Sequence, residues 1–129
     1  MVFTARAIIE VIGHPEDHVN EISKKVLENL KKENGITIIK EEPNSAELVK
    51  ENIYAAHVEV ELKFFDLGKL LNFCYEYLPS EMQIIDAEKI VLSSNEMNNG
   101  LGEMLRRLHR LNLMLHNLNE ANKELKDNK

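Results

Sequence analysis

Residues 56–64 read AHVEVELKF, and this stretch decides the fold class. Ala56, Val58, Val60, Leu62 and Phe64 alternate along it with His57, Glu59, Glu61 and Lys63. A period of two residues is typical of a β-strand with one buried face and one face open to solvent. The stretch therefore predicts a central strand of a sheet whose other face is polar.

A helix is expected on each side of this strand along the chain. The first begins at Pro15, whose fixed φ suits the first turn, continues with apolar residues three and four positions apart, and ends at 34–35, an Asn-Gly pair. The second follows Asp66, a good N-cap residue, has the same helical spacing, and ends before Pro79.

Three further extended segments complete the predicted sheet. Residues 3–12 and 36–42 are rich in β-branched side chains, and Pro43 is expected to stop the second of them because proline cannot donate a ladder hydrogen bond. Residues 44–52 then predict a polar connector with one helical turn, and residues 82–92 supply the last extended segment, either continuous or interrupted near 86–89. The resulting order is β-α-β-β-α-β followed by a long helix.

This order resembles the ferredoxin-like fold, a four-stranded antiparallel sheet with two helices on one face, and places the chain in the α+β class. We expect residues 1–94 to form this domain and residues 95–129 to form an amphipathic, leucine-rich helix of the same structural unit. The element order over residues 3–92 is also similar to that of ACT and RAM regulatory domains. That resemblance implies a small-molecule ligand near the loop that follows the first strand, here residues 13–17.

The last helix carries a heptad pattern. Its first positions are Leu101, Leu108, Leu115 and Asn122, and its fourth positions are Met104, Leu111, Leu118 and Leu125. Apolar residues sustained over four heptads favour a coiled coil, and a single polar residue such as Asn122 can fix its register. We interpret this surface as the contact for a homodimer or a protein partner. The alternative is packing on the chain's own sheet, which the wider stripe made by Leu105, Leu113 and Met114 would also fit.

Composition and charge exclude several classes of partner. The net charge is −6, and residues 1–92 hold ten Lys and Arg against seventeen Asp and Glu. An acidic body opposes binding to nucleic acid or to anionic membranes. The strand at 56–64 also carries glutamates where an RNA-recognition motif would expose aromatic rings that stack on bases. We therefore expect neither nucleic-acid nor membrane binding.

Three groups of polar residues are candidates for chemistry. His57, Glu59 and Glu61 share one strand face and could contact a ligand, bind a metal or form the site of an uncharacterised enzyme, but a solvated charged face is the favoured interpretation. Arg106, Arg107 and Arg110 could grip an acidic partner, but Glu103 stands at ion-pair spacing from two of them. His14 and His18 are weak metal candidates because Pro15 is expected to start the helix between them.

Catalytic and cofactor motifs are missing. Cys74 is the single cysteine and lies on an apolar helix stripe, which excludes an intrachain disulfide and a cysteine-based zinc site. No phosphate-binding glycine motif, signal peptide or span of about 18 apolar residues is present. We expect a small cytoplasmic interaction or regulatory protein with no cofactor and no enzymatic activity.

Overall fold

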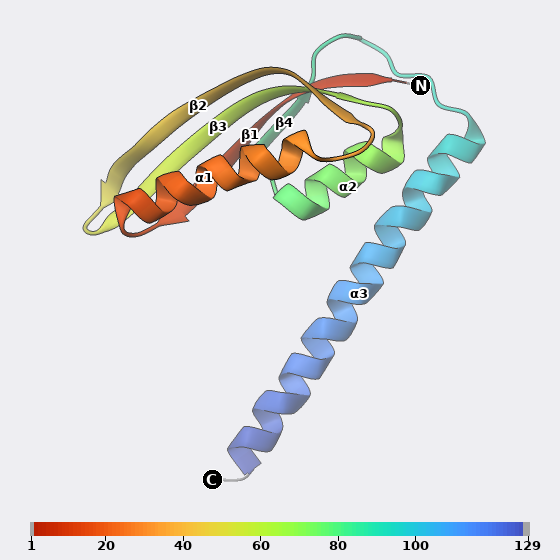
Figure 1. The fold of residues 1–129 in the computed structure, drawn as a ribbon. Helices are drawn as coiled ribbons and strands as arrows, with labels where there is room; N and C mark the ends of the chain where they lie inside the picture. Colours follow the sequence, from red (N-terminus) through yellow and green to blue (C-terminus); the bar gives the residue numbers. More distant parts are fainter. Residues whose placement is uncertain (1, 128–129) are drawn as a thin grey trace.

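The computed structural model describes residues 2–127 and confirms the predicted element order. The elements are β1 (Phe3–Gly13), α1 (Glu16–Lys31), β2 (Ile36–Lys50), β3 (Ile53–Phe64), α2 (Leu67–Tyr77), β4 (Glu81–Ile84) and α3 (Ser94–Asp127). The strands form one sheet in the order β2-β3-β1-β4, with every neighbouring pair antiparallel. Helices α1 and α2 lie together on one face of it (Figure 1). The protein is thus an α+β protein with the ferredoxin-like order.

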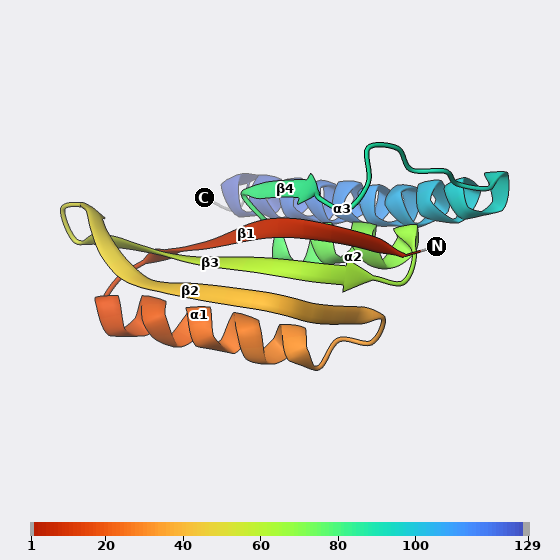
Figure 2. The ribbon, with the colours of Figure 1, turned by 90° about the horizontal axis from the view of Figure 1, so that it is seen from above.

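The strand that decides the fold class occupies the centre of the sheet. β3 pairs with the whole length of β1, from Phe3 opposite Phe64 to Gly13 opposite Tyr54, and with β2 on its other side. Figure 2 shows the strands side by side from above. The apolar residues of 56–64 are buried against the helices, whereas its polar residues point to the open face.

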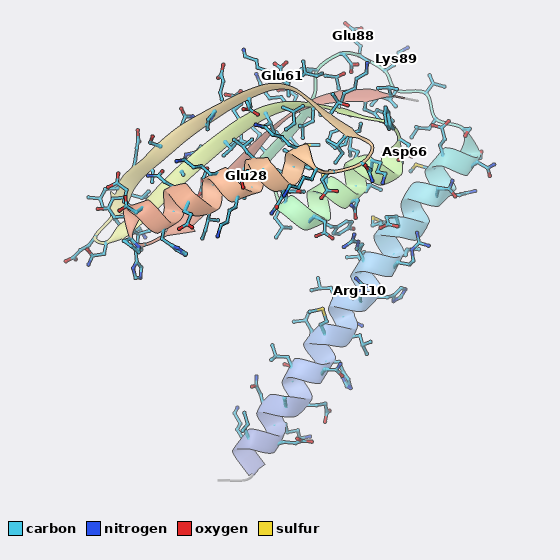
Figure 3. The ribbon with its side chains drawn as sticks, viewed as in Figure 1. Glu28, Glu61, Asp66, Glu88, Lys89 and Arg110 are labelled. Atoms are coloured by element: carbon cyan, nitrogen blue, oxygen red, sulfur yellow. The ribbon has the colours of Figure 1, made fainter. Side chains whose placement is uncertain are left out.

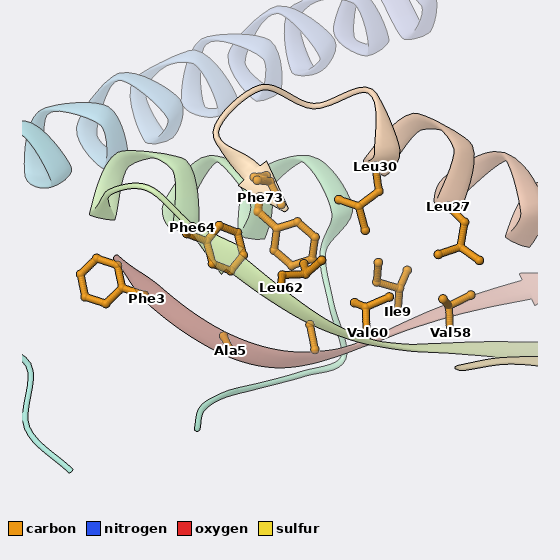
Figure 4. Close-up of a cluster of buried hydrophobic side chains, with 12 residues drawn as sticks. Phe3, Ala5, Ile9, Leu27, Leu30, Val58, Val60, Leu62, Phe64 and Phe73 are labelled. Carbon is orange, nitrogen blue, oxygen red and sulfur yellow. The ribbon is translucent and has the colours of Figure 1, made fainter. Parts of the chain in front are cut away.

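The core lies between the sheet and the two helices that cover it (Figure 4). Phe64 of β3 and Phe73 of α2 are completely buried, with ring centroids 5.5 Å apart in an edge-to-face arrangement. Phe73 also stacks on Tyr77 at 5.2 Å. Leu30 of α1 is completely buried in the same cluster. Burial of side chains of this size contributes roughly 1.5–3 kcal/mol each, so these contacts hold both helices on the sheet.

The prediction that Pro43 stops the second strand is wrong. β2 continues to Lys50, and Pro43 itself lies opposite Val58 of β3. Proline is tolerated here because β2 is an edge strand, which has no second neighbour to receive a hydrogen bond, and because the pairing is irregular between Asn44 and Glu47. Ala46, expected in a connector with a helical turn, is buried in this strand.

The last strand is shorter than the sequence predicts. β4 comprises four residues and pairs with Ala5–Ile8 of β1, and the chain from 85 to 93 is irregular. α3 then begins with a reciprocal cap, in which the Glu96 amide donates to Ser93 Oγ at 3.1 Å and the Ser93 amide donates to the Glu96 carboxylate at 3.3 Å.

The C-terminal helix projects away from the body of the protein. α3 is 34 residues long, which corresponds to about 50 Å. Its first turns pack on α2, and the remainder extends beyond the sheet and both other helices (Figure 1). The helix therefore does not fold back along the chain's own sheet, which was the alternative that the sequence left open.

Candidate interaction surface

The contact between α3 and α2 begins with a close approach at Gly100. A Cβ atom at this position would lie 2.5 Å from Cδ2 of Leu67 and 3.4 Å from Cδ1 of Leu71, both on α2. Only a residue without a side chain leaves room for the two leucines. Sequence reasoning missed this role, although a glycine inside a helix is costly and is itself a signal of close packing.

Arg107 closes the same contact two turns further along α3. Its Nη1 lies 2.6 Å from Oε1 of Glu76, and its Nη2 donates to the side-chain oxygen of Asn72, both on α2. The hydrogen bond to Glu76 is the main reason that the pKa of Arg107 is raised. No sequence signal pointed to Asn72 or Glu76 as partners, because they precede Arg107 by more than 30 residues.

The other two arginines of the predicted basic patch have different environments. Arg106 donates to Glu103 at 2.7 Å, and Arg107 also reaches Glu103, at 3.4 Å. The hydrogen bond from Arg106 is the main cause that lowers the pKa of the Glu103 carboxyl group. Arg110 is exposed on the projecting part of α3 and has no ion-pair partner within residues 2–127 (Figure 3). The patch is thus split between intrachain contacts and one free arginine.

The predicted heptad residues form an exposed apolar surface. Leu108 is 45% exposed, Leu111 is 54% exposed and Leu118 is 58% exposed. Leu101 and Leu115 are exposed too, Asn122 is exposed beside them, and Met104 is half-buried next to the α2 contact. Side chains of this size are normally buried, so a continuous exposed row of them makes this surface the candidate site for an interaction.

One side of α3 changes its environment along its length. Gly100, Met104 and Arg107, spaced four and three residues apart, lie on the side that faces α2. The same spacing continues beyond the end of α2 with Leu111, Met114, Leu118, Ala121 and Leu125, which we call the exposed seam. The side of α3 that is covered by α2 near its start is therefore uncovered over its second half.

Two polar pairs form on the open sheet face. His57 Nε2 lies 2.9 Å from Oε2 of Glu10, and Nε of Arg6 lies 3.7 Å from Oε1 of Glu59. Glu61 lies opposite Arg6 in the ladder and points away from the helices (Figure 3). Within residues 2–127, no three His, Cys, Asp or Glu side chains are arranged to hold a metal ion, and this includes the candidate face of His57, Glu59 and Glu61.

The loop after β1 borders an open hollow of about 460 Å³. His14, Pro15, Glu16, Asp17, Asn52 and Tyr54 line it. His14 precedes α1, whose N-cap is Pro15, and His18 lies inside the helix. Among the described residues, no third His, Cys, Asp or Glu side chain joins them in a group that could hold a metal ion. Cys74 is half-buried on α2, and burial raises the pKa of its thiol.

The fold and this surface define a small α+β protein with a ferredoxin-like sheet and a projecting, apolar C-terminal helix. A family model matches residues 4–128, so the chain belongs to the MJ0538 family. The comparisons with curated proteins and with solved structures found no match. None of the helices in the described part of the chain is long and apolar enough to cross a membrane.

Proposed function

We propose that the protein is a small cytoplasmic interaction protein with a regulatory role, not an enzyme, and that it forms a homodimer through α3. The observation that carries this proposal is the exposed seam on a helix that extends beyond the body of the protein. On the open sheet face, by contrast, Arg6 and His57 are paired with carboxylates of the same face, which leaves less for a partner to gain there.

The energetics favour a covered helix. Leu108, Leu111, Met114, Leu115, Leu118 and Leu125 are each between 45% and 65% exposed in the single chain. Complete burial of such side chains contributes roughly 1.5–3 kcal/mol each, and covering the exposed half of six of them therefore contributes on the order of 5 kcal/mol per helix before entropy. A second copy gains the same amount, because a two-fold dimer buries the same surface on both chains.

The polar residues of the projecting helix also support an interface. Residues 111–119 read LNLMLHNLN and contain no Lys, Arg, Asp or Glu. A helix that stays in water normally carries charged residues on its outer face, whereas the centre of a protein interface is depleted of charge. The uncharged stretch lies in the middle of the part of α3 that extends past α2.

Light scattering over a range of concentrations tests the dimer. The full chain is expected to have twice its monomer mass, and Leu111→Glu with Leu118→Glu is expected to reduce it to the monomer, because both residues lie in the exposed seam. The matched control is Leu113→Glu with His116→Glu, which adds the same charges outside the seam and is expected to leave the dimer intact. A monomeric full chain at all concentrations would refute the proposal.

A second candidate function is the binding of a small metabolite beside the loop of residues 13–17. The hollow lined by His14, Glu16, Asp17 and Tyr54 favours it, because it lies where the resemblance to ACT and RAM domains implies a ligand. A ligand at a hundred times its dissociation constant adds about 2.7 kcal/mol to the stability of the folded state. A thermal-shift screen of amino acids and nucleotides is expected to yield a ligand whose effect is lost in Tyr54→Ala, and a flat screen would count against this function.

A further inference from the structure

We infer that the second copy binds antiparallel to α3, with Arg110 of each chain opposite Glu124 of the partner subunit. This inference rests on the proposed homodimer and adds its orientation and register. It follows from three observations: the space that α2 occupies, the spacing of the exposed seam, and the positions of the free charges on α3.

The position of α2 excludes a parallel pair along the exposed seam. α2 covers the seam side of α3 at Gly100 and Arg107. In a parallel pair, the first turns of the partner's α3 would continue straight along that side and would enter the volume of α2. In an antiparallel pair, only the last turns of the partner's helix reach Arg107, at the end of α2, and the partner's own α2 lies at the opposite end of the seam.

The spacing of the seam allows antiparallel registers seven residues apart, of which the positions of Arg110 and Glu124 favour one. The exposed seam consists of two rows, one with Leu111, Leu118 and Leu125 and one with Met114 and Ala121. In an antiparallel pair, each row of one chain lies opposite the other row of the partner. Leu111 then faces Ala121 of the partner subunit, and Met114 faces Leu118 of the partner subunit. Each layer combines a larger and a smaller or more flexible side chain, which helps two helices to pack closely. The centre of the pair falls near Leu115.

This register brings opposite charges together at the flanks of the seam. Arg110 precedes Leu111 and Glu124 precedes Leu125, so both residues lie on the same flank of α3. In the antiparallel register each of the two arginines faces the partner's glutamate, and the dimer gains the ion pair twice. Neither Arg110 nor Glu124 has an ion-pair partner within residues 2–127 of its own chain. In a parallel pair, the two residues would be about 21 Å apart along the helix.

The other flank gives a direct test of orientation. Leu108 and Asn122 lie on it. The antiparallel register places Leu108 beside Asn122 of the partner subunit, and Leu115 beside Leu115 of the partner subunit. The test uses Leu108→Cys and Asn122→Cys, each in full-length protein that also carries Cys74→Ala, and a short bismaleimide reagent. A covalent dimer is expected when the two proteins are mixed and not with either protein alone, because identical positions are about 21 Å apart in this register.

The outcomes separate the orientation from the dimer itself. A covalent dimer from Leu108→Cys protein alone would mean a parallel pair, and no covalent dimer from a mixture that is dimeric by light scattering would refute the register. Either result would overturn the inference while the proposed homodimer stands. A monomer by light scattering would overturn both.

Charge reversal provides an independent measurement on protein without cysteine substitutions. Arg110→Glu and Glu124→Arg are each expected to raise the dissociation constant of the dimer about 2- to 30-fold, because each creates two like-charge pairs. The double variant is expected to regain the original value. Independent, additive effects in the double variant would overturn the inference, and circular dichroism confirms in each case that α3 remains helical.

Discussion

The guanidinium group of Arg107 on α3 lies 2.6 Å from the carboxylate of Glu76 on α2, and this ion pair fixes the last turn of α2 to the projecting helix. The same group donates to Asn72, one turn earlier on α2, and to Glu103 on its own helix. Arg107 is 25% exposed in its side chain, so most of it is removed from water. Together with the close approach at Gly100, the two acceptors of Arg107 on α2 therefore set the direction in which α3 leaves the body.

Removing Arg107 is expected to loosen α3 from α2. Arg107→Ala should lower the free energy of unfolding by about 1 kcal/mol, because it leaves Glu76 and Asn72 without their donor. The loss is moderate because water screens a partly exposed ion pair. Arg106→Ala is the control, since the ion pair of Arg106 within residues 2–127 is with Glu103 of its own helix and its side chain is 75% exposed. Urea denaturation followed by circular dichroism measures both, and equal losses for the two variants would contradict the role of Arg107.

The two glycines of α3 are expected to respond oppositely to the same substitution. Gly102→Ala should raise the free energy of unfolding by about 0.5–1 kcal/mol, because a Cβ atom there has no neighbour within 4 Å and alanine is the better helix former. The free energy of unfolding of Gly100→Ala should be about 1–3 kcal/mol lower than that of Gly102→Ala, since the new Cβ atom would clash with Leu67. Thermal unfolding of the two variants tests this, and equal gains would show that α3 does not pack closely on α2.

The sheet was predictable because its signals are local. The alternation over 56–64, the N-cap at Asp66 and the helical spacing after Pro15 each depend on neighbouring residues, and each was confirmed, with α1 beginning one residue after Pro15. Pro43 misled the prediction because its effect depends on whether its strand has one neighbour or two. That property belongs to the order of strands in the sheet, which residues 36–50 do not encode by themselves.

The candidate surface was predictable only in part, for a related reason. The heptads identified the apolar residues of α3, but the sequence left open which of them the chain itself would cover. The answer depends on where α2 ends, and thus on the contacts of Gly100 and Arg107 with residues about 30 positions earlier. These contacts place Met104 beside α2 and leave Leu111 and Leu118 exposed.

The left-handed residue after α2 offers a stabilising substitution. Leu78 ends this helix with φ of 45° and is 76% exposed, so its side chain gains little from packing while its backbone is strained. Leu78→Gly is expected to raise the free energy of unfolding by about 0.5–1 kcal/mol. Asn52→Gly is the control, because asparagine tolerates its φ of 61° well and should gain less. Equal or larger gains at Asn52 would argue against strain at Leu78.

Tyr77 is expected to make the stability of the protein depend on pH in the alkaline range. Burial, the hydrogen bond that its hydroxyl donates to Glu33 at 3.1 Å, and the negative charges of Glu33 and Glu76 raise the pKa of Tyr77 to about 12. The folded state therefore holds this proton more tightly than the unfolded state, whose tyrosine has a pKa of 10.0. The resulting contribution is complete below pH 10 and is lost as the pH rises towards about 12.

Ultraviolet absorbance of tyrosinate measures the ionisation, and urea denaturation at several pH values measures the stability. Tyr77→Phe should abolish the transition near pH 12 and should be less stable than the original protein below pH 10, with the difference shrinking as the pH rises. Glu33→Gln is the matched variant, because it keeps the phenol and removes the carboxylate, and it should lower the pKa of Tyr77. A high-pH transition that persists in Tyr77→Phe would show that another group produces it, and the hydrogen bond from Tyr77 of α2 to Glu33, in the connection after α1, would then have no part in the alkaline loss of stability.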